Sequence, residues 1–182
     1  MIVMGYPGIG KSTLAEKSLE YIDLETSNWW NIISTKEKGS MRVRPQGWEK
    51  IYCKIALDLS RQGYIVFTSP NKDIRNCFIK MRENNFITYK DIICVCFPSL
   101  KMQDEWTKRV KERYEQDSSD KNKRALDHVL ECYIDDVTEM AHSPFIHIKL
   151  FNKDYDLESV IQNQKRRSEF IIKEKEMQNN KE

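Results

Sequence analysis

The sequence predicts an α/β protein with a three-layer αβα fold built around a five-stranded parallel sheet. Apolar segments of strand length, rich in Ile, Val, Tyr and Phe, recur along the 182 residues. The segments between them place apolar residues at helical spacing. Strands that alternate with helices are typical of a parallel sheet with crossover helices, and a chain of this length fits one domain.

The expected strands are short and apolar. They are Ile2 to Met4, Tyr21 to Leu24, Tyr64 to Thr68, Ile92 to Phe97 and Phe145 to Leu150. Two connecting helices are indicated by Trp48, Ile51, Tyr52, Ile55 and Leu59, and by Leu126, Val129, Leu130, Tyr133, Ile134 and Val137. Ligands of parallel sheets usually bind beyond the carboxyl ends of the strands, so we expect function in the loops that follow them.

The loop after the first strand, Gly5 to Thr13, reads GYPGIGKST and matches the pattern GxxxxGK[ST] between a strand and a helix. Backbone amides of such a loop bind phosphate oxygens, Lys11 reaches the β- and γ-phosphates, and Ser12 ligates Mg²⁺. The expected ATP-binding residues are Pro7, Gly8, Ile9, Gly10, Lys11, Ser12 and Thr13. The motif alone does not separate kinases from ATPases, GTPases or nucleic-acid motors.

The second strand carries two carboxylates, Asp23 and Glu25, two residues apart and therefore on one face. If this strand lies beside the first, Asp23 faces the γ-phosphate, where it can hold Mg²⁺ or accept a proton from an attacking hydroxyl. We therefore expect Asp23 to act as a base or metal ligand, and Glu25 to contact the substrate. The alternative is a solvated pair that caps the next segment.

Residues 27–47 follow, and their weak periodicity, two tryptophans and several charges fit either a mobile cap over a substrate or an irregular connection. The third strand ends in Thr68 and Ser69, with no acidic residue at its tip. Motor ATPases normally place a carboxylate there, so its absence counts against a motor. Arg75, which follows, is a candidate clamp for an anionic group of the acceptor, or else an ordinary surface arginine.

After the fourth strand, EWTKRVKER places Arg109 and Arg113 four residues apart on one helical face. Two arginines so placed can close over a polyphosphate and stabilise charge during its transfer, so residues 101–124 are the expected lid. The alternative is a pair of exposed helix ion pairs.

Composition excludes several classes. With 30 Lys and Arg against 28 Asp and Glu, the net charge of +2 does not favour nucleic acid as a partner. The five cysteines lack CxxC spacing, which indicates neither a disulfide framework nor a zinc site and suits the cytoplasm. No apolar stretch approaches the ~18 residues that would span a bilayer, so no membrane partner is expected.

Taken in order, these segments resemble the small P-loop kinases, the group that includes nucleoside monophosphate, shikimate and gluconate kinases. The chain looks most similar to uncharacterised kinase-like proteins of bacteriophages and prophages. The resemblance covers most of residues 1–161 through GYPGIGKST, IDLE, QGYIVFTS, the W-x-x-R-x-x-x-R lid and FIHIKLFNKDYDLESVI. It implies the P-loop kinase fold, Mg·ATP as the phosphate donor, a mobile lid and a hydroxyl or phosphate acceptor.

Two departures from that group matter. Lys11 and Asp23 are only twelve residues apart, which predicts a shortened first helix. The third strand also lacks the Asp-Gly-Phe-Pro-Arg signature of adenylate kinases, so AMP as the acceptor is not supported.

The sequence therefore predicts an ATP-dependent kinase with Lys11, Asp23, Arg109 and Arg113 as catalytic residues. Its phosphate acceptor is expected to be a nucleotide, a nucleoside or another small hydroxylated molecule, and a nucleotide-like molecule is favoured. A nucleotide-dependent switch or slow NTPase that acts through a macromolecular partner is the alternative. The absence of a guanine-type NKxD signature favours ATP over GTP. Residues 162–182 are polar and are expected to form a helix or tail, and the pattern does not indicate an oligomeric state.

Overall fold

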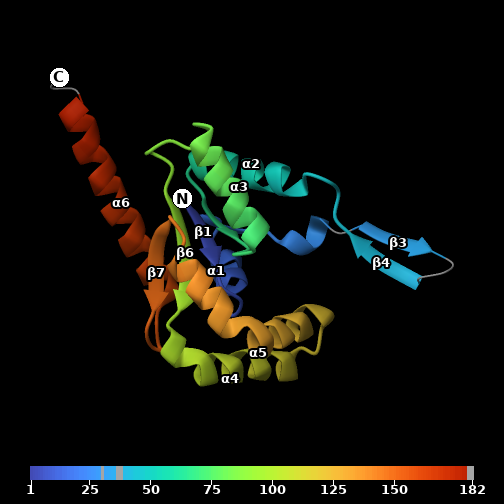
Figure 1. Cartoon of the computed structure of the whole chain (residues 1–182). Helices are drawn as coiled ribbons and strands as arrows, with labels where there is room; N and C mark the ends of the chain where they lie inside the picture. The colour runs from blue at the N-terminus through green and yellow to red at the C-terminus, as the bar shows by residue number, and fades with distance from the viewer. Residues whose placement is uncertain (30, 36–38, 180–182) are drawn as a thin grey trace.

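The computed structural model of the protein describes residues 1–29, 31–35 and 39–179. Its main strands are β1 (Ile2–Gly5), β2 (Tyr21–Asp23), β5 (Ile65–Thr68), β6 (Ile93–Pro98) and β7 (Ile146–Leu150). They form one five-stranded, all-parallel sheet in the order β2–β5–β1–β6–β7 (Figure 1). The predicted α/β class and parallel sheet are confirmed.

Helices cover both faces of this sheet. They are α1 (Lys11–Lys17), α2 (Trp48–Arg61), α3 (Lys72–Glu83), α4 (Gln103–Gln116), α5 (Asp120–Ala141) and α6 (Leu157–Asn179), with 3₁₀ turns η1 (Thr26–Trp29) and η2 (Leu100–Met102). Right-handed crossovers place α1 on one face and α2, α3 and α5 on the other, because the chain reverses its direction across the sheet after β2. The seven residues of α1 agree with the short spacing in the sequence.

The strands at the centre of the sheet are buried on both faces, as all-parallel sheets require. Every residue of β1 and β6 is buried, including Cys94 and Cys96, whose side chains are completely enclosed. Burial raises the pKa of both thiols to about 12, so they remain protonated core groups. Both cysteines therefore belong to the hydrophobic core.

Residues 27–47 contain a second, two-stranded antiparallel sheet, formed by β3 (Asn31–Thr35) and β4 (Gly39–Val43). This hairpin extends away from the main sheet (Figure 1). The predicted substrate cap falls on this segment, of which residues 30 and 36–38 lie outside the described residues. The sequence pattern does not indicate either strand, because their residues are mostly polar or small.

The final helix, α6, starts at Leu157 and therefore before residue 162, where the polar tail was expected to begin. Its first turns pack on the domain: Ile161 is completely buried, and Gln162 and Lys165 contact Glu20 at 3.1 and 3.0 Å. Within the described residues, no helix combines the length and apolar character that crossing a bilayer needs.

Candidate functional site

The glycine-rich loop, residues 5–13, joins β1 to α1 at the carboxyl edge of the sheet. Gly8 and Gly10 adopt φ values of 83° and 100°, a left-handed conformation that residues with a Cβ rarely adopt. A Cβ added at Gly8 would also lie only 3.0 Å from the side chain of Val110 on α4. The loop therefore needs these glycines both for its turn and for its close approach to α4.

Lys11 folds back over this loop. Its Nζ donates hydrogen bonds to the carbonyl oxygens of Gly5 at 2.6 Å and Tyr6 at 3.3 Å. Burial lowers the pKa of the Lys11 ammonium, while the nearby carboxylates of Asp23 and Glu25 raise it. The ammonium is thus held at the centre of the loop, surrounded by oxygen atoms that only partly compensate its charge.

Ser12 and Asp23 are brought together, although β5 lies between β1 and β2. β2 therefore does not lie beside β1, the arrangement on which the expected position of Asp23 depended. The two residues meet because α1, which carries Ser12, packs on β2. Ser12 Oγ donates a hydrogen bond of 2.6 Å to Asp23 Oδ2, so a hydroxyl and a carboxylate oxygen lie side by side.

A cavity of about 590 Å³ opens above the loop. It is lined by the loop, by the ends of β2 and β5, and by α4 and α5, including Asp23, Glu25, Ser69, Pro70, Arg109, Arg113 and Lys121. The structure therefore brings ten predicted residues into one cavity: Pro7, Gly8, Gly10, Lys11, Ser12, Thr13, Asp23, Glu25, Arg109 and Arg113. Ile9, which was also predicted, does not line it. The segment predicted as a lid, residues 101–124, forms η2, α4 and the first turn of α5 along one side of this cavity.

Two aromatic residues fasten the glycine-rich loop from other parts of the chain. Trp106 Nε1 on α4 donates a 2.8 Å hydrogen bond to the carbonyl of Pro7, and the hydroxyl of Tyr155 donates one of 3.0 Å to the carbonyl of Ile9. The two rings stack with their centroids 6.2 Å apart and their planes inclined by 13°. Sequence reasoning missed Tyr155, because its only signal is a single tyrosine shortly before the last helix.

The guanidinium of Arg109 lies over both rings, 5.4 Å from the centroid of Trp106 and 5.3 Å from that of Tyr155. A second cavity, of about 320 Å³, lies beside this stack. Its lining residues are Met102, Glu105, Trp106, Lys108, Arg109, Glu112, Lys153 and Asp154. Because Arg109 also lines the larger cavity, it marks the boundary between the two.

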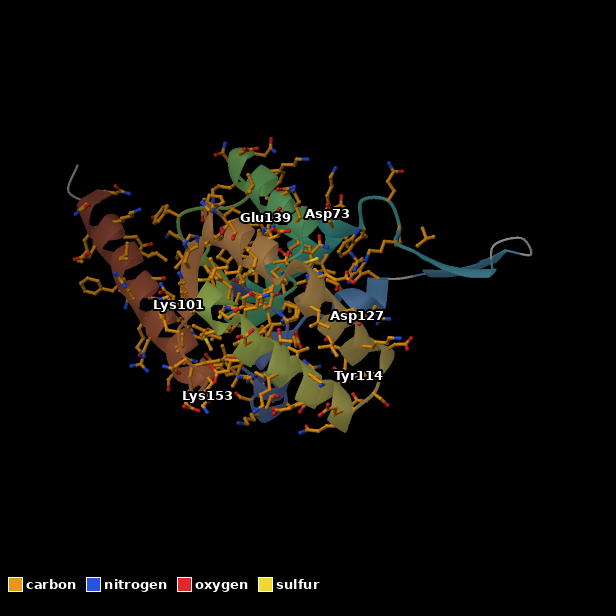
Figure 2. All side chains as sticks on the ribbon, turned by 60° about the horizontal axis from the view of Figure 1, so that its bottom comes forward. Asp73, Lys101, Tyr114, Asp127, Glu139 and Lys153 are labelled. Atoms are coloured by element: carbon orange, nitrogen blue, oxygen red, sulfur yellow. The ribbon has the colours of Figure 1, made fainter. Side chains whose placement is uncertain are left out.

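Arg75 is not among the cavity-lining residues. It is buried on α3, where its guanidinium donates to the carbonyl of Pro70 and pairs with Glu139 of α5. Figure 2 shows Glu139 on α5 in the same region as Asp73 at the start of α3. Arg75 therefore supports the loop of Pro70, which does line the cavity, and is not placed to bind an acceptor directly.

Tyr52 of α2 ties together the ends of β2 and β5. Its hydroxyl donates to the carbonyl of Leu24 at 2.6 Å and accepts from the amide of Ser69 at 3.3 Å. Trp29 and Trp48 pack against its ring, with centroids 6.2 and 5.7 Å away. This cluster fixes the cavity wall next to the β3–β4 hairpin, and sequence analysis did not assign these residues to the wall.

Among the described residues, no group of three or more His, Cys, Asp or Glu side chains is arranged to hold a metal ion. A metal at this site would therefore take few ligands from the protein. No protein-family model matches the chain, and no curated protein matches it significantly.

Proposed function

We propose that the protein is an ATP-dependent phosphotransferase of the P-loop kinase type, which transfers the γ-phosphate of Mg·ATP to a small hydroxylated or nucleotide-like acceptor. One observation carries the proposal: Lys11, the Ser12–Asp23 pair, Arg109 and Arg113 all line one cavity at the carboxyl edge of a parallel sheet. Phosphoryl transfer depends mainly on positioning and on stabilisation of charge. These side chains supply both.

Lys11 and the loop amides are the proposed ligands of the β- and γ-phosphates. The ammonium now donates to two neutral carbonyls, those of Gly5 and Tyr6. A phosphate oxygen is a stronger acceptor because it is charged, so it competes well for the same protons. Arg109 and Arg113 face the loop from α4, where they can neutralise charge on the group being transferred.

The residues present fit Mg²⁺. Ser12 and Asp23 supply oxygen ligands, which Mg²⁺ prefers, and this ion usually keeps several waters and takes further ligands from substrate phosphates. The buried Thr68 hydroxyl, just before cavity-lining Ser69, has no hydrogen-bond partner among the described residues, which suits a site that takes water or ligand. Bound Mg²⁺ would supply charge neutralisation, with Asp23 as its ligand or as acceptor of the hydroxyl proton.

The second cavity is the proposed place for the base of ATP. Its shared border at Arg109 allows one nucleotide to occupy both cavities, with its phosphates on the glycine-rich loop. Of the three stacked groups, Trp106 and Arg109 line this cavity. The Trp106 side chain is buried, so the planar guanidinium of Arg109 is the surface on which a purine can stack.

The test measures ADP release from Mg·ATP in the presence of a panel of nucleosides, nucleoside monophosphates and sugar acids. We expect one acceptor class to accelerate release strongly, and Lys11→Ala to abolish this release without unfolding the protein. Lys17→Ala, on the exposed last turn of α1, is the matched control and should behave as wild type.

The outcomes separate the two candidate functions. Full activity in Lys11→Ala would refute the kinase assignment. Slow hydrolysis that depends on Lys11 but that no acceptor stimulates would instead favour a nucleotide-dependent switch.

A further inference from the structure

An ion pair links two walls of the larger cavity. Lys121, in the first turn of α5, pairs with Glu25, which follows β2. The two side chains are 49% and 31% exposed, so the pair is accessible to solvent and can open at modest cost. Both residues line the cavity that contains Lys11.

Lys121 acts electrostatically on the phosphate side of this cavity. Burial is the main cause that lowers the pKa of Lys11, and the positive charge of Lys121 lowers it further. The two ammonium groups are therefore close enough to repel each other. A triphosphate bound between them would relieve this repulsion and attract both.

The location of Lys121 in its helix also indicates that this ammonium can bind a phosphate group. Cations are unfavourable in the first turn of a helix, where the backbone amides carry partial positive charge. Lys121 is the second residue of α5, and it is stabilised there by an anion, now the Glu25 carboxylate. A phosphate group can replace that carboxylate as the counter-charge.

We propose that Lys121 is a further phosphate-binding residue. In this proposal, the ion pair with Glu25 keeps the Lys121 ammonium away from the nucleotide phosphates until the acceptor binds. Acceptor hydroxyls that donate hydrogen bonds to Glu25 displace Lys121, whose ammonium then moves to the γ-phosphate. The ion pair thus links occupancy of the acceptor site to stabilisation of the transferring group, and it limits the transfer of phosphate to water. This inference rests on the proposed kinase function.

The test uses equilibrium binding, so it does not require the acceptor to be known. Calorimetry measures the affinities of wild type, Glu25→Gln, Lys121→Met and the double variant for Mg·ADP and for the Mg²⁺ complex of the β,γ-imido analogue of ATP. We expect Glu25→Gln to bind the triphosphate analogue about three- to tenfold more tightly, because Lys121 is released, with little change for ADP. Lys121→Met and the double variant should have nearly the same affinity as each other for Mg·ADP, and likewise for the triphosphate analogue.

Two controls separate this effect from a general change of charge. Glu16→Gln removes the same charge from the lining of the same cavity, and it should shift both nucleotides alike. Lys123→Met changes an exposed lysine one position from buried Asn122 on α5 and should change neither affinity. If Glu25→Gln unfolds the protein, Glu25→Ala takes its place in all four measurements.

Tighter triphosphate binding that persists in the double variant, or that Glu16→Gln reproduces, would overturn the proposal. So would an unchanged affinity in Glu25→Gln. Failure of the proposed function itself has a different signature: no acceptor would accelerate ADP release from Mg·ATP, whatever affinities the Glu25 and Lys121 variants show.

Discussion

Ser12 Oγ donates a 2.6 Å hydrogen bond to Asp23 Oδ2 and so joins the first turn of α1 to the end of β2. Ser12 comes after β1 in the chain, and in the sheet β5 separates β1 from β2, the strand that carries Asp23. Their contact places a hydroxyl and a carboxylate next to Lys11. Oxygen atoms of this kind can bind Mg²⁺, and a carboxylate can also accept a proton.

Asp23→Asn tests this relationship. The substitution keeps the size of the side chain but removes its charge, so we expect turnover of Mg·ATP to fall about 100-fold or more. Binding of ATP in the presence of EDTA should be retained, because Lys11 and the loop amides are unchanged. Steady-state kinetics and calorimetry measure the two effects. Turnover close to that of wild type would contradict a role for this carboxylate.

Arg109 and Arg113 should differ in their kinetic effects. Arg113 lines only the larger cavity, so Arg113→Met is expected to lower kcat about 100-fold with little change in the KM for ATP. Arg109 also borders the second cavity, so Arg109→Met should raise the KM for ATP as well. Lys111→Met, on an exposed part of the same helix, is the control. Equal effects of the two arginine variants on KM would argue against a base site beside Arg109.

Tyr155→Phe removes the hydrogen bond to the carbonyl of Ile9 and keeps the ring. Burial raises the pKa of the Tyr155 hydroxyl to about 12, so the group is a neutral donor at physiological pH. We expect about 1 kcal/mol of lost stability and a severalfold weaker affinity for ATP, because the loop loses one of its supports. Chemical denaturation and calorimetry check these effects, and unchanged nucleotide affinity would show that the support is dispensable.

Substitutions of Arg75 and Glu139 should affect stability more than catalysis, and the two should lower the free energy of unfolding by different amounts. The side chain of Arg75 is 8% exposed, whereas that of Glu139 is 45% exposed and also contacts Lys72. Glu139→Ala leaves a buried guanidinium without its carboxylate and should cost about 3 kcal/mol. Arg75→Met leaves a carboxylate that water and Lys72 can still solvate, and it should cost about 2 kcal/mol. Urea unfolding gives both values; the reverse order would contradict this account.

His128 should make stability depend on pH. The hydrogen bond from its Nε2 to Asp136, 2.6 Å long, raises the pKa of His128 above the usual 6.5. Because the folded-state pKa is raised, the stabilisation is fully present below about pH 6.5 and is lost as the pH rises through the folded-state value. Urea unfolding measures the free energy of unfolding at pH 5.5 and at pH 8.5. The difference between the two values should be smaller in His128→Gln than in wild type. An equal difference in the two proteins would exclude this contribution.

The central strands β1, β5 and β6 were predictable because they are enclosed on both faces and therefore read as continuous apolar segments. The glycine-rich loop was predictable because one short segment contains all of its chemistry. The β3–β4 hairpin was not, since its strands lack the apolar alternation that marks a half-buried strand.

The rest of the site depends on contacts between distant segments. Nothing near Arg75 in the sequence indicates that Glu139, 64 residues later, pairs with it and turns a candidate substrate ligand into a structural support. Lys121 and Tyr155 are likewise ordinary polar residues of helix and loop until the fold places them beside the loop and Glu25. A local sequence pattern predicts residues that act within one short segment. It does not predict which distant side chain a residue contacts in the fold.

The attachments of the glycine-rich loop also bear on how the chain folds during synthesis. The loop leaves the ribosome well before its supports, because the residues that fasten Pro7 and Ile9 follow 99 and 146 positions later in the chain. Contacts between such distant residues form late, because a long segment must first be ordered. A nascent chain is therefore expected to acquire nucleotide affinity only after Tyr155 has emerged, which would keep incomplete chains from sequestering ATP.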